Sequence, residues 1–362
     1  MEEKMEQTCF DRLAELLRTA QSRRASDVRL VGGQQTTIWV DGRVKMLDGR
    51  SFTAAELSEL LEVMLDEERR SRLEREGEVE FSRDVEGVCR VRGHAFHQQG
   101  GYALALRLIP FAVPEAESLF LPQSVQKLAP CGHGLVIAGG MAGSGVTTTM
   151  ASLAASVLRE GTRTVLTLER PVEYRFLKSG ALVIQREIGT DCVSYAAALS
   201  AAVRQKADVI MVGEIEDAET LLAAIAAAES GCLVFGAARG ENAVSVLERL
   251  MAFIPPASAR QIGGRLAAVL RAAVAQRLLP GADGDGRIAA FEVLPATDAV
   301  CRLIREEKFQ QLASVLEAGK EPGLLSMDDA VFELYMKSRI TAETAVAFAC
   351  SPDEMKEKIR LF

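Results

Sequence analysis

The sequence lacks an excess of positive charge. Lysine and arginine together number 42, against 50 aspartate and glutamate residues, which gives a formal net charge of −8 at pH 7. Proteins that bind nucleic acid without regard to its sequence need a basic surface to neutralise phosphate groups. We therefore expect no nucleic-acid partner, although the count leaves room for a local basic patch.

Cysteine pairs are also missing. The seven cysteines are scattered, odd in number and nowhere spaced as C-x-x-C, which argues against a disulfide framework and a zinc site. The first residues, Met1–Glu6, are acidic and include no apolar stretch, so we expect no signal peptide. Reduced thiols without an export signal predict a cytoplasmic protein.

Long apolar runs are few as well. One stretch, Cys131–Leu158, contains no Asp, Glu, Lys or Arg, but it is rich in glycine, serine and threonine. A membrane-spanning helix needs about 20 predominantly apolar residues. The stretch therefore predicts a strand, a loop and a helix of a buried core, and we expect no integral membrane segment.

The first third of the chain has the pattern of an α+β domain, which we assign to residues 1–113. The 362 residues suggest two or three domains, and 48% are apolar, enough for a sizeable core. The Asp41-Gly42 pair predicts a tight hairpin turn. Helical spacing and alternation predict helices at 11–21 and 53–73, the second opening on a Thr53–Glu56 capping box, and strands at 26–31, 36–40, 78–81, 89–92 and 104–109. Prolines then mark a linker at 114–130.

From residue 131 the pattern changes to strands that alternate with helices. This is typical of a parallel sheet with helices on both faces, and the strands are apolar throughout. The expected strands lie at 134–138, 164–168, 208–212 and 232–236, followed by a hairpin from 271–279 and 287–294. We therefore predict an α/β domain at 131–295 and a C-terminal helical region at 296–362.

Residues 140–147, Gly-Met-Ala-Gly-Ser-Gly-Val-Thr, lie between a predicted strand and a predicted helix. A phosphate-binding loop, G-x-x-x-x-G-K-[ST], has this context. Val146 replaces the lysine that would reach the β- and γ-phosphates, but backbone N–H groups can still face an anion. The candidate nucleotide-binding residues of the loop are Gly140, Gly143, Ser144, Gly145, Thr147 and Thr148, with Thr147 as a candidate Mg²⁺ ligand.

Further motifs occur in a fixed order along the chain. They are ASDVRL at 25–30, AFHQ at 95–98 with RLIP at 107–110, TLERPVEY at 167–174, QREIG at 185–189, DVIMVGE at 208–214, GCLVFGAAR at 231–239 and AVCRLIRE at 299–306. In this order they resemble the motifs of the type IV pilus retraction motors of the PilT/PilU kind, within the type II/IV secretion ATPases. The resemblance covers nearly the whole chain.

The resemblance implies a fold, a cofactor and a set of roles. The implied fold is an N-terminal PAS-like α+β module, a RecA-like P-loop NTPase domain and C-terminal helices. ATP and Mg²⁺ are the implied cofactors. Glu169 matches the proposed catalytic glutamate, and Glu214 matches the Walker B glutamate, a second candidate for catalysis and for Mg²⁺. Arg92 and Arg107 match arginines that contact the nucleotide.

The resemblance also implies partners. Members of the family form hexameric rings, so we expect a homo- or hetero-hexamer with related pilus motors, acting on the inner-membrane platform protein of the pilus. The expected location is the cytoplasm, with at most a peripheral association with the inner membrane.

Besides Arg29, which replaces a histidine in the first motif, five positions depart from the family pattern. Val146 replaces the lysine, Arg170 replaces an aspartate, and Cys232 and Arg239 replace two histidines. Gly100 falls where the family usually carries an arginine. We expect these departures to cluster around one site and to weaken its chemistry, because ATP hydrolysis needs cationic groups to stabilise the charge of the transition state.

Three functions fit this pattern. The favoured one is an accessory ring subunit with weakened or lost ATP hydrolysis. The second is an active retraction motor that uses a substitute cation, such as Arg239 or an arginine from a neighbour. The third is a regulator that binds nucleotide without turnover.

The segment 299–306 predicts a helix with one apolar and one charged side. Ala299, Leu303 and Ile304 share the apolar face, since they are spaced at i, i+4 and i+5. We expect the charged side to bind a partner through Arg302, Arg305 and Glu306.

Overall fold

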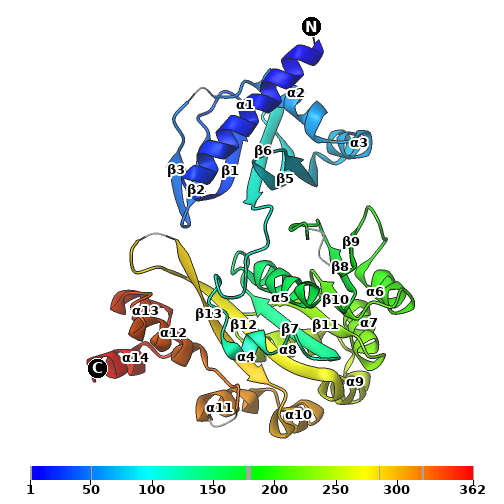
Figure 1. The fold of residues 1–362 in the computed structure, drawn as a ribbon, viewed down its shortest axis with the longest axis vertical. Coiled ribbons are helices and arrows are strands. Elements are labelled where there is room, and N and C mark those ends of the chain that lie inside the picture. The colour runs from blue at the N-terminus through cyan, green and yellow to red at the C-terminus, as the bar shows by residue number, and fades with distance from the viewer. Residues whose placement is uncertain (1, 50, 177–180, 285, 320–321, 362) are drawn as a thin grey trace. The chain divides into compact units, whose positions relative to one another are not determined.

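The computed structural model describes residues 2–49, 51–176, 181–284, 286–319 and 322–361 (Figure 1). The chain forms two compact units. The first comprises residues 1–112 and 171–175, and the second comprises 113–170 and 176–362. Among the described residues, no helix combines the length and the apolar character that crossing a membrane requires.

The first unit is a six-stranded antiparallel sheet covered by helices on one face. Its core forms where side chains of α1 and α2, such as Leu13 and Leu57, meet alternate strand residues such as Ile38 and Leu104. The strand order is β3-β2-β1-β6-β5-β4. The elements are α1 (Glu2–Ser22), β1 (Ala25–Val31), β2 (Thr37–Val40), β3 (Arg43–Met46), α2 (Ala54–Met64), α3 (Glu67–Glu76), β4 (Glu78–Val85), β5 (Cys89–Gln98) and β6 (Gly101–Ile109).

Local sequence signals set the turns of this unit. Asp41 and Gly42 both have positive φ, 52° and 76°, as the predicted type I′ hairpin turn requires. The predicted capping box at Thr53 is present. The single helix predicted over 53–73 is wrong, because Leu65 is extended and the side chain of Asp66 accepts from the Arg69 N–H to start a second helix.

A short segment from the middle of the sequence, Pro171–Arg175, belongs to the first unit. The buried Arg90 donates from Nε to the carbonyl of Val172 at 2.9 Å. Arg92 pairs with Glu173 at 3.0 Å, and Arg175 pairs with Asp84 at 2.9 Å. The segment therefore groups with the first unit, although the strand pattern predicts it within the α/β domain at 131–295.

The second unit is built on a seven-stranded sheet in the order β13-β12-β7-β11-β10-β8-β9. All neighbouring strands are parallel except β12 and β13, which form the predicted hairpin. The strand β9 was not predicted. The elements are α4 (Gln123–Gln126), β7 (Gly134–Gly140), α5 (Val146–Glu160), β8 (Val165–Glu169), β9 (Val183–Glu187), α6 (Tyr195–Arg204), β10 (Val209–Val212), α7 (Ala218–Glu229), β11 (Leu233–Arg239), α8 (Ala243–Ala252), α9 (Pro256–Val269), β12 (Leu270–Pro280) and β13 (Arg287–Pro295).

Helices cover both faces of this sheet. Strand residues such as Ile137 and Ile210 pack with α6, α7, α8 and α9, whereas their neighbours Val136 and Val209 pack with α5. The second face also holds Val125 and other apolar residues of the predicted linker 114–130. Burial on both faces explains why these strands are apolar throughout.

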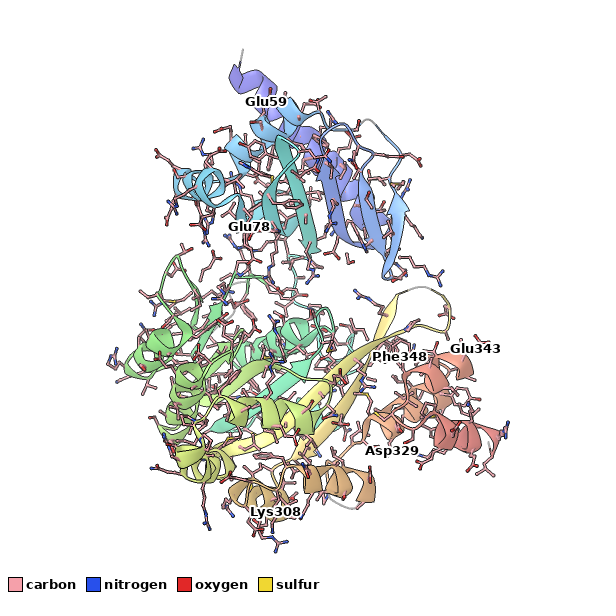
Figure 2. All side chains as sticks on the ribbon, turned by 180° about the vertical axis from the view of Figure 1, so that it is seen from behind. Glu59, Glu78, Lys308, Asp329, Glu343 and Phe348 are labelled. Atoms are coloured by element: carbon pink, nitrogen blue, oxygen red, sulfur yellow. The ribbon has the colours of Figure 1, made fainter. Side chains whose placement is uncertain are left out.

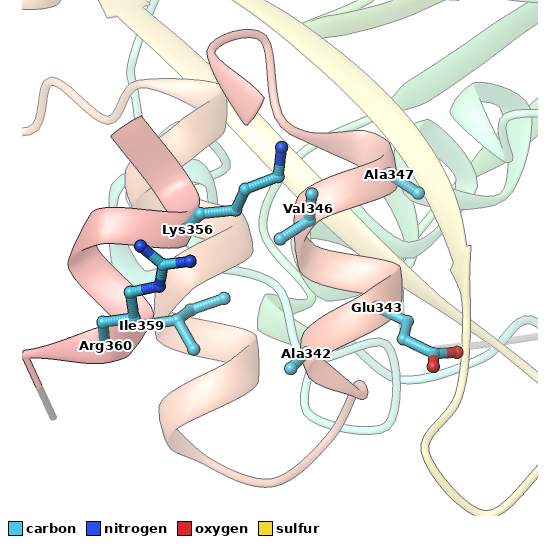
Figure 3. A pocket seen from close by; sticks show the side chains of 7 residues that line it. All are labelled: Ala342, Glu343, Val346, Ala347, Lys356, Ile359 and Arg360. Carbon is cyan, nitrogen blue, oxygen red and sulfur yellow. The ribbon is translucent and has the colours of Figure 1, made fainter. Parts of the chain in front are cut away.

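After the hairpin, the described residues form the helices α10 (Asp298–Arg305), α11 (Gln310–Ala318), α12 (Met327–Met336), α13 (Ala342–Phe348) and α14 (Pro352–Arg360). The last three pack against Leu279 and Ala290 of the hairpin. A shallow hollow of about 490 Å³ lies between α13 and α14, with Val346 and Ile359 on its walls and Lys356 and Arg360 beside it (Figure 3).

The buried carboxylate of Glu292 links the hairpin to the surrounding helices. It lies on β13 and accepts a hydrogen bond from the Ala243 N–H, at the start of α8, at 2.7 Å. The Met327 N–H at the start of α12 also faces it. Burial raises the pKa of Glu292 above its ordinary value, and the hydrogen bond from Ala243 and the charge of Arg277 offset only part of that rise.

We predict that Glu292 makes the protein less stable as pH rises. Its folded-state pKa lies above its unfolded value of 4.5, so above about pH 4.5 the folded chain holds this proton more tightly than the unfolded chain does. The urea midpoint of Glu292→Gln should therefore fall less between pH 5 and pH 8 than that of the wild type.

Glu229→Gln is the matched control. The hydrogen bond from Arg265 lowers the pKa of Glu229, so removing this carboxylate should have the opposite effect on the pH dependence, and a small one because the pair is partly exposed. An unchanged pH dependence in Glu292→Gln would contradict the interpretation of Glu292.

Candidate nucleotide site

Four candidate positions meet at one edge of the second sheet. Parallel strands end at a common edge, and here β7 ends at Gly140, β8 at Glu169 and β11 at Arg239, while Glu214 follows β10. Arg239 is the register partner of Gly140. The Gly213 N–H donates to the carbonyl of Leu168 at 2.7 Å, which holds the Glu214 loop beside the end of β8. Ligands of open α/β sheets bind at this side, beyond the carboxyl ends of the strands.

The glycine loop has the backbone of an anion-binding turn. Gly143 and Gly145 have φ values of 79° and 89°, which side chains rarely allow. A Cβ at Gly140 would lie 2.8 Å from the backbone carbonyl of Gln276, which cannot move aside, so glycine is required there too. Gly145 starts the 15-residue helix α5 without a side-chain cap, and Thr147 lies half-buried in the first turn. The loop therefore fits a phosphate group through its backbone N–H groups.

Gln276 contacts the start of α5 beside this loop, and the sequence did not predict it as a site residue. It is the register partner of Gly140 on β12, on the side opposite Arg239. Its buried side chain accepts a hydrogen bond from Oγ1 of Thr149 at 2.7 Å. The strand pattern predicted β12, but no signal in the sequence marked this polar residue as a partner of α5.

Val146 occupies the lysine position and contributes to packing. Its half-buried side chain contacts the core between α5 and the sheet, which includes Met150 and Val136. The position therefore supplies no charge to the loop.

The carboxylates of the site already have partners. Glu169 is 3% exposed and accepts from Oγ1 of Thr167 at 2.7 Å. Glu214 accepts from Nε of Arg239 at 2.7 Å. Arg239 is one of the departures from the family pattern, so the carboxylate expected to act as the Walker B glutamate is paired with a cation.

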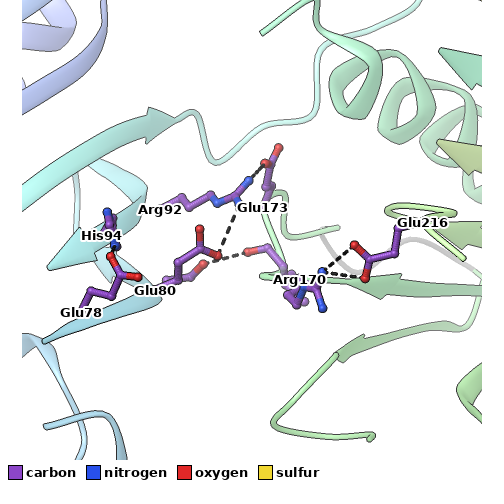
Figure 4. A network of polar contacts seen from close by, with 9 residues as sticks. Glu78, Glu80, Arg92, His94, Arg170, Glu173 and Glu216 are labelled. Carbon is purple, nitrogen blue, oxygen red and sulfur yellow. Dashed lines mark hydrogen bonds and ion pairs between the residues drawn. The ribbon is translucent and has the colours of Figure 1, made fainter. Parts of the chain in front are cut away.

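Arg170, another departure, pairs with a carboxylate in the same region. One of its nitrogens, Nη2, lies 2.8 and 3.0 Å from the two carboxylate oxygens of Glu216 (Figure 4). The guanidinium also lies 5.8 Å from the ring centre of Tyr195. Burial and the nearby carboxylates together raise the pKa of Tyr195, despite the charge of Arg170, so this hydroxyl stays protonated.

The donors fit a phosphate better than a metal ion. Magnesium prefers oxygen ligands, and the candidate ligands here are the Thr147 hydroxyl and a Glu214 carboxylate that Arg239 already neutralises. Within the described ranges, no three His, Cys, Asp or Glu side chains are grouped as metal ligands. The guanidinium contacts Oε1 of Glu214, so Mg²⁺ would compete with Arg239 at that oxygen.

The departures do not all surround one site, which corrects the sequence-based expectation. Cys232 precedes β11 and lies at the amino ends of the strands, about 20 Å from Arg239 along the strand. Its Sγ donates to the Ala207 carbonyl at 3.2 Å inside the core. Gly100 has a φ of 76° in the turn between β5 and β6, so the turn itself favours glycine.

Arg92 and Arg107 belong to the first unit, where they are register partners on β5 and β6. Arg92 pairs with Glu173 at 3.0 Å (Figure 4) and with Glu80 at 3.5 Å. Arg107 pairs with Asp27 at 3.1 Å. No motif in the sequence marked these acidic residues as partners of the two arginines.

The charged side of α10 is exposed, as the helical spacing predicted. Arg302, Arg305 and Glu306 are exposed, whereas Leu303 and Ile304 are buried. Glu306 pairs with Lys308 at 2.7 Å. Figure 2 labels Lys308, which is exposed. Packing of the helix thus accounts for its apolar face but not for its charged residues.

Comparisons with known proteins agree with the motifs. The chain is 34% identical over 346 residues to the type IV pilus ATPase PilU of Pseudomonas aeruginosa, covering 96% of this chain and 91% of that protein. It is 32% identical to the retraction ATPase PilT of the same organism, covering 94% and 99%.

Structure comparison gives the same result. The crystal structure of the pilus retraction motor PilT with bound ADP has a TM-score of 0.82 and 36% identity, covering 95% of this chain and 98% of that one. Residues 120–324 match the family described as type II/IV secretion system protein. The chain therefore belongs to the type II/IV secretion system ATPases and is a PilT/PilU-like member of that family.

Proposed function

We propose that this chain is an accessory subunit of a type IV pilus retraction machine, with weakened or lost ATP hydrolysis. It would assemble into a hexameric ring, alone or with a related motor, and contact the inner-membrane platform protein from the cytoplasm. The PilU and PilT names of its relatives support the pilus assignment.

The observation that carries the proposal is the packing of Val146. A lysine there would make charge-assisted contacts with the phosphates, and losing one costs about 1.5–3 kcal/mol, or roughly one to two decades in affinity. The backbone of the loop supports binding of a phosphate. We therefore expect weak nucleotide binding and poor stabilisation of the transition state.

The two arginine pairs add to this effect. Catalysis of phosphoryl transfer depends on cations that face the developing charge, whereas Arg170 and Arg239 face Glu216 and Glu214. An exposed pair such as Arg239–Glu214 is worth at most about 1 kcal/mol. The missing lysine is thus the larger effect on nucleotide binding, whereas the two pairs keep both arginines from facing the charge of the transition state.

An active motor is the second candidate, and the position of Arg239 favours it. Arg239 lies beside Gly140 in the register, and 70% of its side chain is exposed. If the guanidinium left Glu214, it could reach a phosphate and free the carboxylate for Mg²⁺ in one movement. A regulator that binds nucleotide without turnover is a further alternative, supported by the intact loop backbone.

One comparison separates these functions. ATP affinity and the ATPase rate should be measured for the purified protein, alone and mixed with an active retraction motor. Millimolar or undetectable binding, no turnover, and a changed rate of the active motor would support the accessory role. Saturable hydrolysis that Glu214→Gln or Arg239→Ala abolishes would favour the active motor, and tight binding without turnover would favour the regulator.

We predict that Val146→Lys tightens ATP binding about 10- to 100-fold without restoring hydrolysis. The added amine supplies phosphate contacts, but Arg170 and Arg239 remain paired with carboxylates. Val146→Met is the control, since it adds length without charge. Robust hydrolysis by Val146→Lys alone would show that the two arginines are harmless.

We predict that Arg302→Ala combined with Arg305→Ala removes any effect on the partner motor without unfolding the chain. Both side chains are exposed, and exposed substitutions usually change stability by less than about 0.5 kcal/mol. Arg72→Ala with Arg75→Ala, on the exposed side of α3, removes the same charge elsewhere. A lower unfolding temperature with an intact effect on the motor would make α10 purely structural.

A further inference from the structure

The strand β3 forms an open edge of the first sheet. It is the terminal strand in the order, and β2 is its neighbour. All four of its residues are exposed, with Val44 at 58% and Met46 at 56%. Folded proteins usually protect such edges, because unpaired backbone groups and apolar side chains there bind other strands.

The register shows which backbone groups are unpaired. The two-residue turn makes Val40 and Arg43 a hydrogen-bonded pair, and such pairs alternate with non-bonded ones along an antiparallel ladder. The Leu47 N–H donates to the Thr36 carbonyl at 2.9 Å, as expected for a hydrogen-bonded pair four positions further along the strand from Arg43. The N–H and C=O groups of Val44 and Met46 therefore point away from β2, toward the open edge.

The side chains of β3 give the two sides of the edge different chemistry. Val44 lies opposite Trp39, and Met46 lies opposite Thr37. These residues are on the face away from α1 and α2, because Ile38 belongs to the core on the other face. Val44, Met46 and the half-buried Trp39 thus form an exposed apolar strip.

The alternate residues of β3 are basic. Arg43 and Lys45 project from the opposite side of the strand to Val44 and Met46. Neither has an ion-pair partner among the residues that the structure describes. The strand β3 therefore offers two cations on one side and apolar side chains on the other, where the guanidinium of Arg29 on β1 lies 5.1 Å from the ring centre of Trp39.

We propose that the open edge of β3 binds an extended segment of another protein in which acidic and apolar residues alternate. The segment would add a strand beside β3, with hydrogen bonds to Val44 and Met46. Its apolar residues would extend the strip beside Trp39, and its carboxylates would face Arg43 and Lys45. This mode of recognition takes affinity from the main chain and specificity from alternate side chains.

Charge disfavours a second copy of this chain as the occupant. If two β3 strands paired antiparallel through these edges, the Arg43 and Lys45 side chains of both copies would lie on one face. Like charges directly opposite one another destabilise a sheet. The inference concerns the first unit alone and does not depend on the state of the nucleotide site.

The test uses the full chain and two synthetic peptides of eight residues, one alternating glutamate with valine and threonine, the other with lysine in place of glutamate. Trp39 is the one tryptophan of the chain, so its fluorescence reports on this edge. The glutamate peptide should change the fluorescence saturably, and the lysine peptide should bind at least 10-fold more weakly. Arg43→Glu with Lys45→Glu should reverse this preference.

Blocking the backbone tests whether the peptide binds as a strand. Val44→Pro removes an N–H that points outward and spares the bonds to β2, so binding should fall at least 10-fold, whereas Val44→Thr should bind nearly normally. N-methylation of alternate peptide nitrogens gives a second test that needs no variant. Only the set of nitrogens facing β3 should abolish binding.

Three results would overturn the proposal. They are equal binding of both peptides, full binding by Val44→Pro, and insensitivity to N-methylation of either set. Self-association of the chain that Val44→Pro abolishes would identify a second copy as the occupant and would equally contradict it. If Val44→Pro fails to fold, the methylated peptides decide the question.

Discussion

The common carboxyl edge of the parallel strands is the constraint on which the candidate site depends. It brings Gly140, Glu169, Glu214 and Arg239 together, although 99 positions separate the first from the last in the numbering. The sheet can impose this only because helices bury both of its faces. A substitution at any one of these strand ends therefore changes the surroundings of the others. The lost lysine and the gained arginine act within one small region.

Neutralisation of charge at the carboxyl ends of these strands explains how the fold tolerates two substitutions by arginine. Replacing histidine by Arg239 and aspartate by Arg170 adds positive charge, and the carboxylates of Glu214 and Glu216 neutralise it. Because these pairs are partly exposed, they stabilise the fold little. Their main effect is on which ligand can approach, since an incoming anion or metal ion must compete with a partner already present.

Much of the fold could be predicted from the sequence, and the failures have physical causes. Fully buried strands such as β7 stand out as apolar runs, whereas β9 is half-buried along its length and mixes apolar with charged residues. The break at Leu65 was missed because the helical spacing continues across it. The loop at 140–147 and Arg239 were recognisable from their motifs, but the partner Gln276 comes from a distant strand, and only the folded register reveals it.

The segment Pro171–Arg175 makes the first unit discontinuous in the sequence. The chain passes between the units at three points, after Ala112, Arg170 and Arg175. A fragment ending at Ala112 would leave the guanidinium of Arg90, now 7% exposed, without its acceptor at Val172. The N-terminal unit is therefore not a module that can be cut from the chain intact, and a truncation that spares every one of its strands would still remove part of its surface.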